Sequence, residues 1–321
     1  MKKILSVLLT FIGINVSAQV MPDSTVQFVA NWSAGDRFKY SFDKLEYKVT
    51  DTDTTYTEQM NEIIEFEVME ATETSYKLKL SSLEYTSSDE SQNVLSKLYA
   101  DKFGTQELIL NTNQFGQFQS CDNSAELVAQ MKELIEPTID MLGKFPKKER
   151  QAIIDYMMQM YDSPDFINAL LAPYVILFNF HGTRLEIGKE YSGVVEAPSF
   201  IPNVQTMIPL NTSISVKPDN VTEDYAIPFL RKYSEGDTLT IAIMEAIKGM
   251  LSSASISEED AKTLLEELLA CDFSLSESEA TQIHFATGVP LSHFYQKVIS
   301  GKDNGKFIQK VEERCFQYVV E

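Results

Sequence analysis

The segment Ile64–Leu80, IEFEVMEATETSYKLKL, carries the clearest fold signal in the chain. Its two halves alternate apolar with charged residues: glutamates separate Ile64, Phe66 and Val68, and lysines separate Tyr76, Leu78 and Leu80. A period of two is typical of half-buried strands, and the polar stretch between the halves is typical of a turn. The segment predicts a β-hairpin with a buried apolar face. On its outer face, glutamates and lysines would pair across the strands for roughly a few tenths of a kcal/mol each.

Strand patterns extend to both sides of this hairpin. Upstream, Phe38, Tyr40 and Phe42 share one phase, and Leu45, Tyr47 and Val49 share the other. A β-bulge near Asp43–Lys44 would bring all six to one face. Downstream, Leu108–Leu110 and Phe115–Phe118 predict a second hairpin that turns near Asn111–Asn113.

The middle of the chain changes to a helical period. A helix is predicted from Ser124, capped by Asn123 or Ser124 and broken at Pro137. A second apolar stripe follows Phe145–Pro146, and a third helix starts near Ser163–Pro164. The run from 174 to 178 is either the continuation of that helix or a buried strand.

Strands return at about 190–195, 205–216 and 224–231, where Pro209 and Pro228 indicate edges or bulges. A helical pair is predicted at about 240–270, with a capping box opening its second helix at Ser257. The stretch 283–320 then reads as three strands that close the chain, and its composition favours a sheet edge over a site.

These patterns predict an α+β fold in which a large curved antiparallel sheet, half-barrel-like, carries helical insertions packed on one face. We expect a single domain over residues 19–321, with a helical insertion at about 123–172. No repeat or low-complexity linker divides it.

The first residues, MKKILSVLLTFIGINVSAQ, resemble a cleaved secretory signal: two lysines, a short apolar run and small residues before Gln19. The alternative is an uncleaved anchor or a core helix. We expect an exported, periplasmic or extracellular protein, soluble after cleavage of residues 1–18. No later apolar run is long enough for a transmembrane segment.

The chain is strongly acidic. It has 47 acidic and 27 basic residues, and removal of residues 1–18 takes away two lysines and no acid, so the mature charge is −22. Such a surface repels nucleic acid and anionic lipid headgroups, which argues against both as partners. Of the three cysteines, Cys271 and Cys315 form the pair best placed for a disulfide.

Two histidines flank the turn at Gly288–Val289. If those two residues form a type II′ turn, His284 and His293 lie opposite each other on neighbouring strands. This pair is a weak candidate for a zinc or copper site, because a third ligand would be needed. A turn at Val289–Pro290 would break the pairing. We expect no bound metal and no cofactor.

Motifs of known enzyme classes are absent from the sequence. It contains no G-x-S-x-G, H-E-x-x-H, C-x-x-C or glycine-rich phosphate loop. Paired carboxylates of a hydrolase remain an alternative, because such pairs are close in space and not in sequence. A non-enzymatic function is favoured.

Methionines are concentrated in the helical insertion, where they suit irregular apolar contacts. A curved sheet partly covered by such helices could hold an acyl chain or another apolar molecule. The predicted lining residues are Tyr40, Phe42, Phe66, Tyr76, Met157 and Met158. The alternative is that these side chains only complete the core.

The body of the chain, from Ala34–Tyr40 through the hairpin at Thr287–Pro290, is similar to secreted Bacteroidetes-type families of unknown function. In its order of long strands, inserted helices and closing strands, the chain also resembles the half-barrel periplasmic lipoprotein carriers, although it is longer than they are. The resemblance implies a role with a hydrophobic ligand and assigns no residue. The leading hypothesis is therefore an exported protein that binds a lipid or other apolar ligand. The alternative is an envelope protein that binds a partner chain through exposed sheet edges.

Overall fold

The computed structural model describes residues 20–21, 23–51, 53–198, 207–235, 239, 273–303 and 306–320. The predicted signal peptide, the helical pair at 240–270 and Cys271 lie outside these residues.

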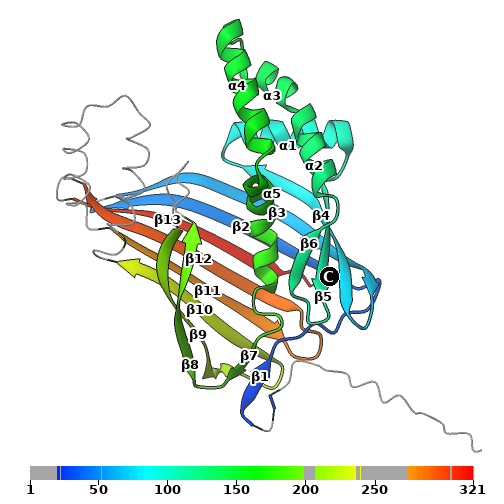
Figure 1. Cartoon of the computed structure of the whole chain (residues 1–321), viewed down its shortest axis with the longest axis vertical. Helices are drawn as coiled ribbons and strands as arrows, with labels where there is room; N and C mark the ends of the chain where they lie inside the picture. Colours follow the sequence, from blue (N-terminus) through cyan, green and yellow to red (C-terminus); the bar gives the residue numbers. More distant parts are fainter. Residues whose placement is uncertain are drawn as a thin grey trace, which may run out of the picture.

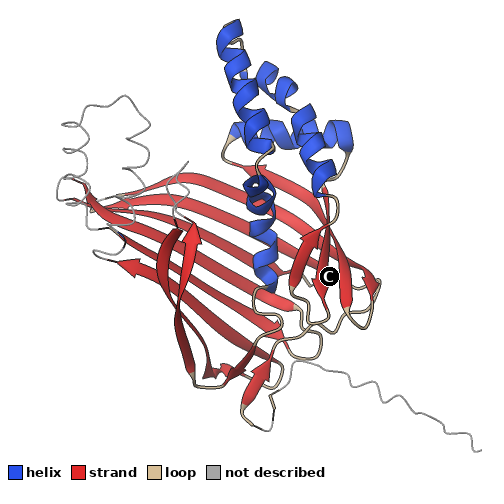
Figure 2. Cartoon of the chain, viewed as in Figure 1, coloured by secondary structure: helices blue, strands red, loops and turns tan. Residues whose placement is uncertain are grey.

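One large antiparallel sheet dominates the described chain (Figures 1 and 2). Its eleven strands follow the order β6-β5-β4-β3-β2-β13-β12-β11-β10-β9-β8. Their bounds are β2 (Arg37–Thr50), β3 (Thr54–Ala71), β4 (Ser75–Ser87), β5 (Glu107–Asn113), β6 (Phe118–Cys121), β8 (Glu190–Pro198), β9 (Met207–Val221), β10 (Tyr225–Glu235), β11 (Ser274–His284), β12 (Pro290–Asp303) and β13 (Lys306–Tyr318). Strands β1 (Thr25–Gln27) and β7 (Arg184–Glu186) form a separate pair.

Helices lie between β4 and β5 and between β6 and β7. They are α1 (Glu90–Phe103), α2 (Ser124–Glu133), α3 (Ile135–Leu142), α4 (Lys147–Tyr161), α5 (Pro164–Val175) and the short 3₁₀ helix η1 (Ile176–Phe178). Helices α1–α4 form an arm beyond the sheet, and α5 runs from that arm across one sheet face (Figure 1). The α+β fold with an open antiparallel sheet and packed helical insertions is thereby confirmed.

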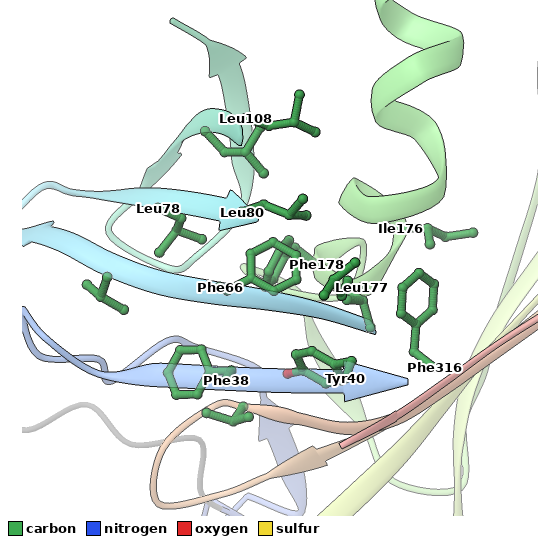
Figure 3. Close-up of a cluster of buried hydrophobic side chains, with 14 of the residues drawn as sticks. Phe38, Tyr40, Phe66, Leu78, Leu80, Leu108, Ile176, Leu177, Phe178 and Phe316 are labelled. Atoms are coloured by element: carbon green, nitrogen blue, oxygen red, sulfur yellow. The ribbon is translucent and has the colours of Figure 1, made fainter. Parts of the chain in front are cut away.

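The core forms where α5 and η1 meet the sheet. Phe66 and Leu80, from β3 and β4, pack with Leu177 and Phe178 of η1 (Figure 3). We call this side of the sheet the inner face; its strands carry Phe38, Tyr40, Phe42, Ile64, Phe66, Leu78 and Leu80. The sequence allows either a helix or a strand for the run 174–178. In the structure this run completes α5 and continues as η1.

The hairpin at Ile64–Leu80 is confirmed. Phe66 lies opposite Leu80 and Val68 opposite Leu78, while on the outer face Lys79 Nζ lies 3.0 Å from a carboxylate oxygen of Glu67. The proline prediction also holds at Pro228, where the register of β10 against β9 shifts.

Two expectations are wrong. There is no bulge at Asp43–Lys44: β2 pairs with β13 in unbroken register from Tyr40 to Thr50. Leu45, Tyr47 and Val49 therefore lie on the outer face, where the Tyr47 hydroxyl donates to Glu313 at 2.9 Å. The closing strands are not an edge, since β11, β12 and β13 occupy the middle of the sheet. The predicted break at Pro137, by contrast, is present: α2 ends at Glu133, and Pro137 lies in the first turn of the next helix, α3, where a missing N–H is tolerated.

Helix α1 was not anticipated. The Asp89 side chain caps it by accepting a hydrogen bond from the Ser91 backbone N–H at 2.9 Å, and Gly104 ends it with φ of 84°. Its apolar stripe is weak, with Tyr99 as its one buried residue. The capping Asp89 and the terminal Gly104 therefore indicate this helix in the sequence more clearly than its apolar stripe does.

Candidate functional site

A band of polar side chains crosses the inner face beside the aromatic core. Because directly opposite residues of antiparallel strands share a face, the register orders these side chains into rows. One row contains Glu279, Tyr295, Arg314 and Lys44, and the next contains Lys232, Glu277, Lys297, Glu312, Glu46 and Glu58. We call these two rows the polar band.

Ion pairs connect the polar band both along single strands and between neighbouring strands. Lys44 Nζ lies 2.8 Å from Glu46 and 2.9 Å from Glu58, and the Arg314 guanidinium lies 2.5 Å from Glu312. These side chains keep between 17% and 20% of their surface exposed. Half-buried pairs gain little net stability, because desolvation offsets their attraction. The band is therefore a costly way to stabilise a sheet face.

The most buried acid of the band is Glu279, on β11. Its carboxylate is 4% exposed and accepts hydrogen bonds from Asn179 Nδ2, 3.2 Å from each oxygen. Asn179 follows η1, so the helix that covers the core also supplies this donor. Burial raises the pKa of Glu279 to about 7, against the opposing effect of the Asn179 hydrogen bond.

A second buried acid, Glu62, lies on β3 between the core and the band. It is 2% exposed, and the Tyr174 hydroxyl of α5 donates to it at 3.0 Å. Burial raises the pKa of Glu62, while hydrogen bonds from Ser82 and Tyr174 oppose the shift. Each acid thus has its own hydrogen-bond donors.

His293 lies in the row between core and band, opposite Thr281 and Phe316. Its Nδ1 lies 2.7 Å from the Thr281 hydroxyl, and its buried Nε2 has no hydrogen-bond partner within the described residues. Burial, and secondarily the positive charge of the nearby Arg314, lower the pKa of His293 to about 3. The imidazole is therefore neutral at physiological pH.

The predicted histidine pair is not formed. His293 lies opposite Thr281, and a shift after Gln282 places Ile283 opposite Pro290. The loop is longer than two residues: the Gly288 N–H donates to the His284 carbonyl, and His284 lies 3.0 Å from the Thr287 hydroxyl. Over the described ranges, no group of three or more His, Cys, Asp or Glu is arranged to hold a metal ion. His284 instead lines a surface pocket of about 570 Å³ together with Asp224 and Phe285.

Five of the six predicted lining residues divide between two clusters, and Met158 belongs to neither. Tyr40, Phe42 and Phe66 are at most 1% exposed in the main core, and Tyr76 packs against them. Met157 packs in a different cluster within the helical arm, and Met158 is 37% exposed. The structure therefore does not bring the two methionines to the four aromatic residues.

Sequence reasoning missed the buried acids. Glu62 continues the phase of Ile64 and Phe66, and Glu279 continues the phase of Leu275 and Ile283. A charged residue in the apolar phase of a strand was the available signal.

Beyond the polar band, the inner face becomes apolar again. The row that contains Glu279 continues through Leu230, Ile214 and Tyr191 on β10, β9 and β8. Leu230 and Ile214 are half-buried and pack against a second core cluster that includes Phe28 and Val216, whereas Tyr191 is 38% exposed. Val195, further along β8, shares this face with the buried Leu210 and is 39% exposed. One sheet face thus joins an accessible apolar surface to a band of charges.

Neither family models nor curated proteins match the chain. Among solved structures, it is similar to the one described as "Lipid-protein interactions in lipovitellin", with 9% identity and a TM-score of 0.43. That match covers 90% of this chain, which spans about a quarter (26%) of the other. OmpT, an outer membrane protein of Vibrio cholerae, matches with 7% identity and a TM-score of 0.16, over 91% of this chain and 99% of that one. Likenesses this weak assign neither a family nor a ligand, and the resemblance to half-barrel carriers stays a prediction.

Proposed function

We propose that this chain is an exported, non-enzymatic protein that binds an amphipathic lipid on the inner face of its sheet. The observation that carries the proposal is the row Tyr191–Ile214–Leu230–Glu279–Tyr295–Arg314. Its first half is apolar and its second half is polar, as is a molecule with a hydrocarbon chain and a polar head.

The apolar part would receive the hydrocarbon chain. Contact with β8–β10 would remove apolar side-chain surface from water at roughly 25 cal/mol per Å². Tyr191 and Val195 contribute most, because more than a third of each remains exposed.

The polar band would receive the head. Arg314, Lys44 and Tyr295 offer donors, and the ion-paired glutamates offer acceptors. Since a lipid head brings its own charges and hydrogen bonds, it would give the half-buried band a function that stability alone does not explain. Export rests on the signal-like residues 1–18.

The test uses two neighbouring residues of β8 that lie on opposite faces. Val195→Glu places a charge on the inner face, and Val194→Glu places the same charge on the outer face, where Val194 is 67% exposed. Both positions tolerate a polar side chain sterically, so each variant serves as the folding control of the other. Phe66, which is fully buried, is unsuitable for this purpose.

The exported chain and both variants would be purified natively and extracted with organic solvent, and the extracts analysed by mass spectrometry. We expect a stoichiometric lipid in the unmodified chain and in Val194→Glu, and its loss in Val195→Glu. Folded protein that yields no lipid and takes up no fluorescent fatty acid would disprove the proposal. Equal loss in both variants would place the ligand elsewhere.

Strand addition at an edge is the second candidate. Within the described residues, β8 pairs only with β9, so one side of its backbone is free to pair with another strand. The closing strands cannot serve this purpose, since both neighbours of each are present. A proline at Val194, an edge position, would abolish capture of a partner strand and leave lipid content unchanged.

A further inference from the structure

The end of the helical arm has the opposite character to the rest of this acidic chain. Its sequence is MLGKFPKK, from Met141 to Lys148, and joins α3 to α4. We call this segment the arm tip. Helix α4 leads from the tip back into α5, which packs on the sheet, so the tip lies at the end of the arm away from the sheet (Figure 1).

The arm tip exposes large apolar side chains. Met141 is 55% exposed, Leu142 50% and Phe145 38%. Exposed apolar residues continue along one side of α4 at four-residue spacing, through Tyr156, which is 64% exposed, and Met160. Several exposed large apolar side chains gathered at one end of an element point to an interaction site.

The arm tip is also basic. Lys144, Lys147 and Lys148 are exposed, and none forms an ion pair with a described residue. Arg150, the next basic residue, forms ion pairs with Glu136 at 3.3 Å and with Asp140 at 2.9 Å. Glu149 is the one acid within the exposed run 141–149. Three free lysines therefore surround the exposed Leu142 and Phe145.

We propose that the arm tip docks the protein on the surface of an anionic lipid bilayer. Apolar side chains enter the boundary between headgroups and acyl chains, while neighbouring lysines pair with lipid phosphates. Charge complementarity favours this partner. A fluid bilayer also accepts side chains as unlike as methionine, leucine and phenylalanine without a shaped pocket. The inference does not depend on a ligand of the inner face.

The overall acidity of the chain does not prevent this contact. Charges are screened over about 8 Å at physiological ionic strength. Helix α4 alone, with 15 residues, is about 22 Å long, so the acids of the sheet lie beyond that distance from the tip. Near the tip itself, Glu136 and Asp140 are paired with Arg150, which leaves Glu149 against three lysines, so the expectation that a net negative chain avoids anionic headgroups does not apply to this end of the molecule.

The test uses a tryptophan at the tip. Phe145→Trp would add an exposed reporter, while the single native tryptophan, Trp32, is 4% exposed and keeps a constant emission. The exported chain would be titrated with vesicles of phosphatidylcholine alone and of phosphatidylcholine and phosphatidylglycerol in a three-to-one ratio. We expect a blue shift of the emission and co-sedimentation with the second kind only.

Two charge variants, both made in the Phe145→Trp protein, distinguish the effect of the tip lysines from the effect of the net charge of the whole chain. Lys144→Glu, Lys147→Glu and Lys148→Glu together should weaken binding about 100-fold, since each lysine contributes roughly fivefold at an anionic surface. The matched control reverses three exposed lysines elsewhere, Lys97, Lys217 and Lys306. It should bind as the unmodified chain does. Leu142→Asp should weaken binding with no change in the number of lysines.

Thermal unfolding of each variant would show that the fold is retained. Absence of a blue shift and of sedimentation with phosphatidylglycerol vesicles would overturn the inference. A tip that binds a protein partner and no bilayer would give this same negative result. Equal loss in the tip variant and its control would also overturn it, because net charge would then be the cause.

Discussion

Glu279 offers a direct test of how the inner face is built. Its carboxylate is 4% exposed, and burial raises its pKa to about 7 from 4.5. In Glu279→Gln the shape and the contact with Asn179 are largely kept, and the titration is removed. The difference between the two proteins then reports on this single group.

The direction in which stability changes with pH follows from where Glu279 binds its proton. Between pH 4.5 and about 7 the native state holds the proton on Glu279, whereas the unfolded state releases it. The free energy of unfolding therefore falls as pH rises through this window. The stabilising contribution is fully present below pH 4.5 and is lost once the pH passes about 7. A shift of this size corresponds to about 3 kcal/mol.

The assay is urea unfolding of both proteins across this pH window. Glu62, His181 and His293 also titrate abnormally, but they are present in both proteins and cancel in the difference. As pH rises through this window, we expect the free energy of unfolding of Glu279→Gln to increase by about 3 kcal/mol relative to that of the unmodified chain. A constant difference would refute a buried, protonated Glu279.

Three further substitutions test the surrounding structure. When pH falls from about 7.5 to 5, the free energy of unfolding of His293→Leu should increase by about 2 kcal/mol relative to that of the unmodified chain. The reason is that burial lowers the pKa of His293, so that in this window only the unfolded state takes up a proton and the unmodified protein loses stability. Urea unfolding at both pH values checks this. Gly288→Ala should cost about 3 kcal/mol or more in thermal unfolding, since φ is +68° and a Cβ would lie 2.0 Å from the Val29 carbonyl oxygen; an unchanged melting temperature would contradict that close approach. Phe316→Ala should cost about 3–5 kcal/mol, because the ring is fully buried and stacks on Phe42 at 4.1 Å; a loss below about 1 kcal/mol would mean that the core collapses around the cavity.

Local patterns predicted the elements whose partners are near in sequence. The hairpin Ile64–Leu80 needs only its own alternation and a polar turn, and both are visible in the sequence. Helix α4 likewise follows Phe145–Pro146 as its apolar stripe indicates. These elements were predictable because each buries its apolar side on neighbouring parts of the chain.

The second half of β2 was misassigned because its partners are remote. Lys44 and Glu46 keep the inner-face phase of Phe42, and they do so with partners on β3 and, nearly 270 residues away, on β13. The sequence around them shows only that Leu45 and Tyr47 are apolar, which suggests that the strand shifts to bury them. A bulge is the local explanation, and a charged inner face is the non-local one that the structure has.

The same distinction changes the ligand hypothesis. An apolar cavity lined by Phe42, Phe66 and Met157 was the natural expectation from aromatic strands and methionine-rich helices. In the structure, α5 and η1 already fill the aromatic part, and Met157 packs within the arm. The accessible apolar surface lies instead on β8–β10 beside a second core cluster, and the polar band separates it from the aromatic core. A purely apolar ligand would leave that band unused, so the arrangement of rows favours a molecule with both a chain and a head.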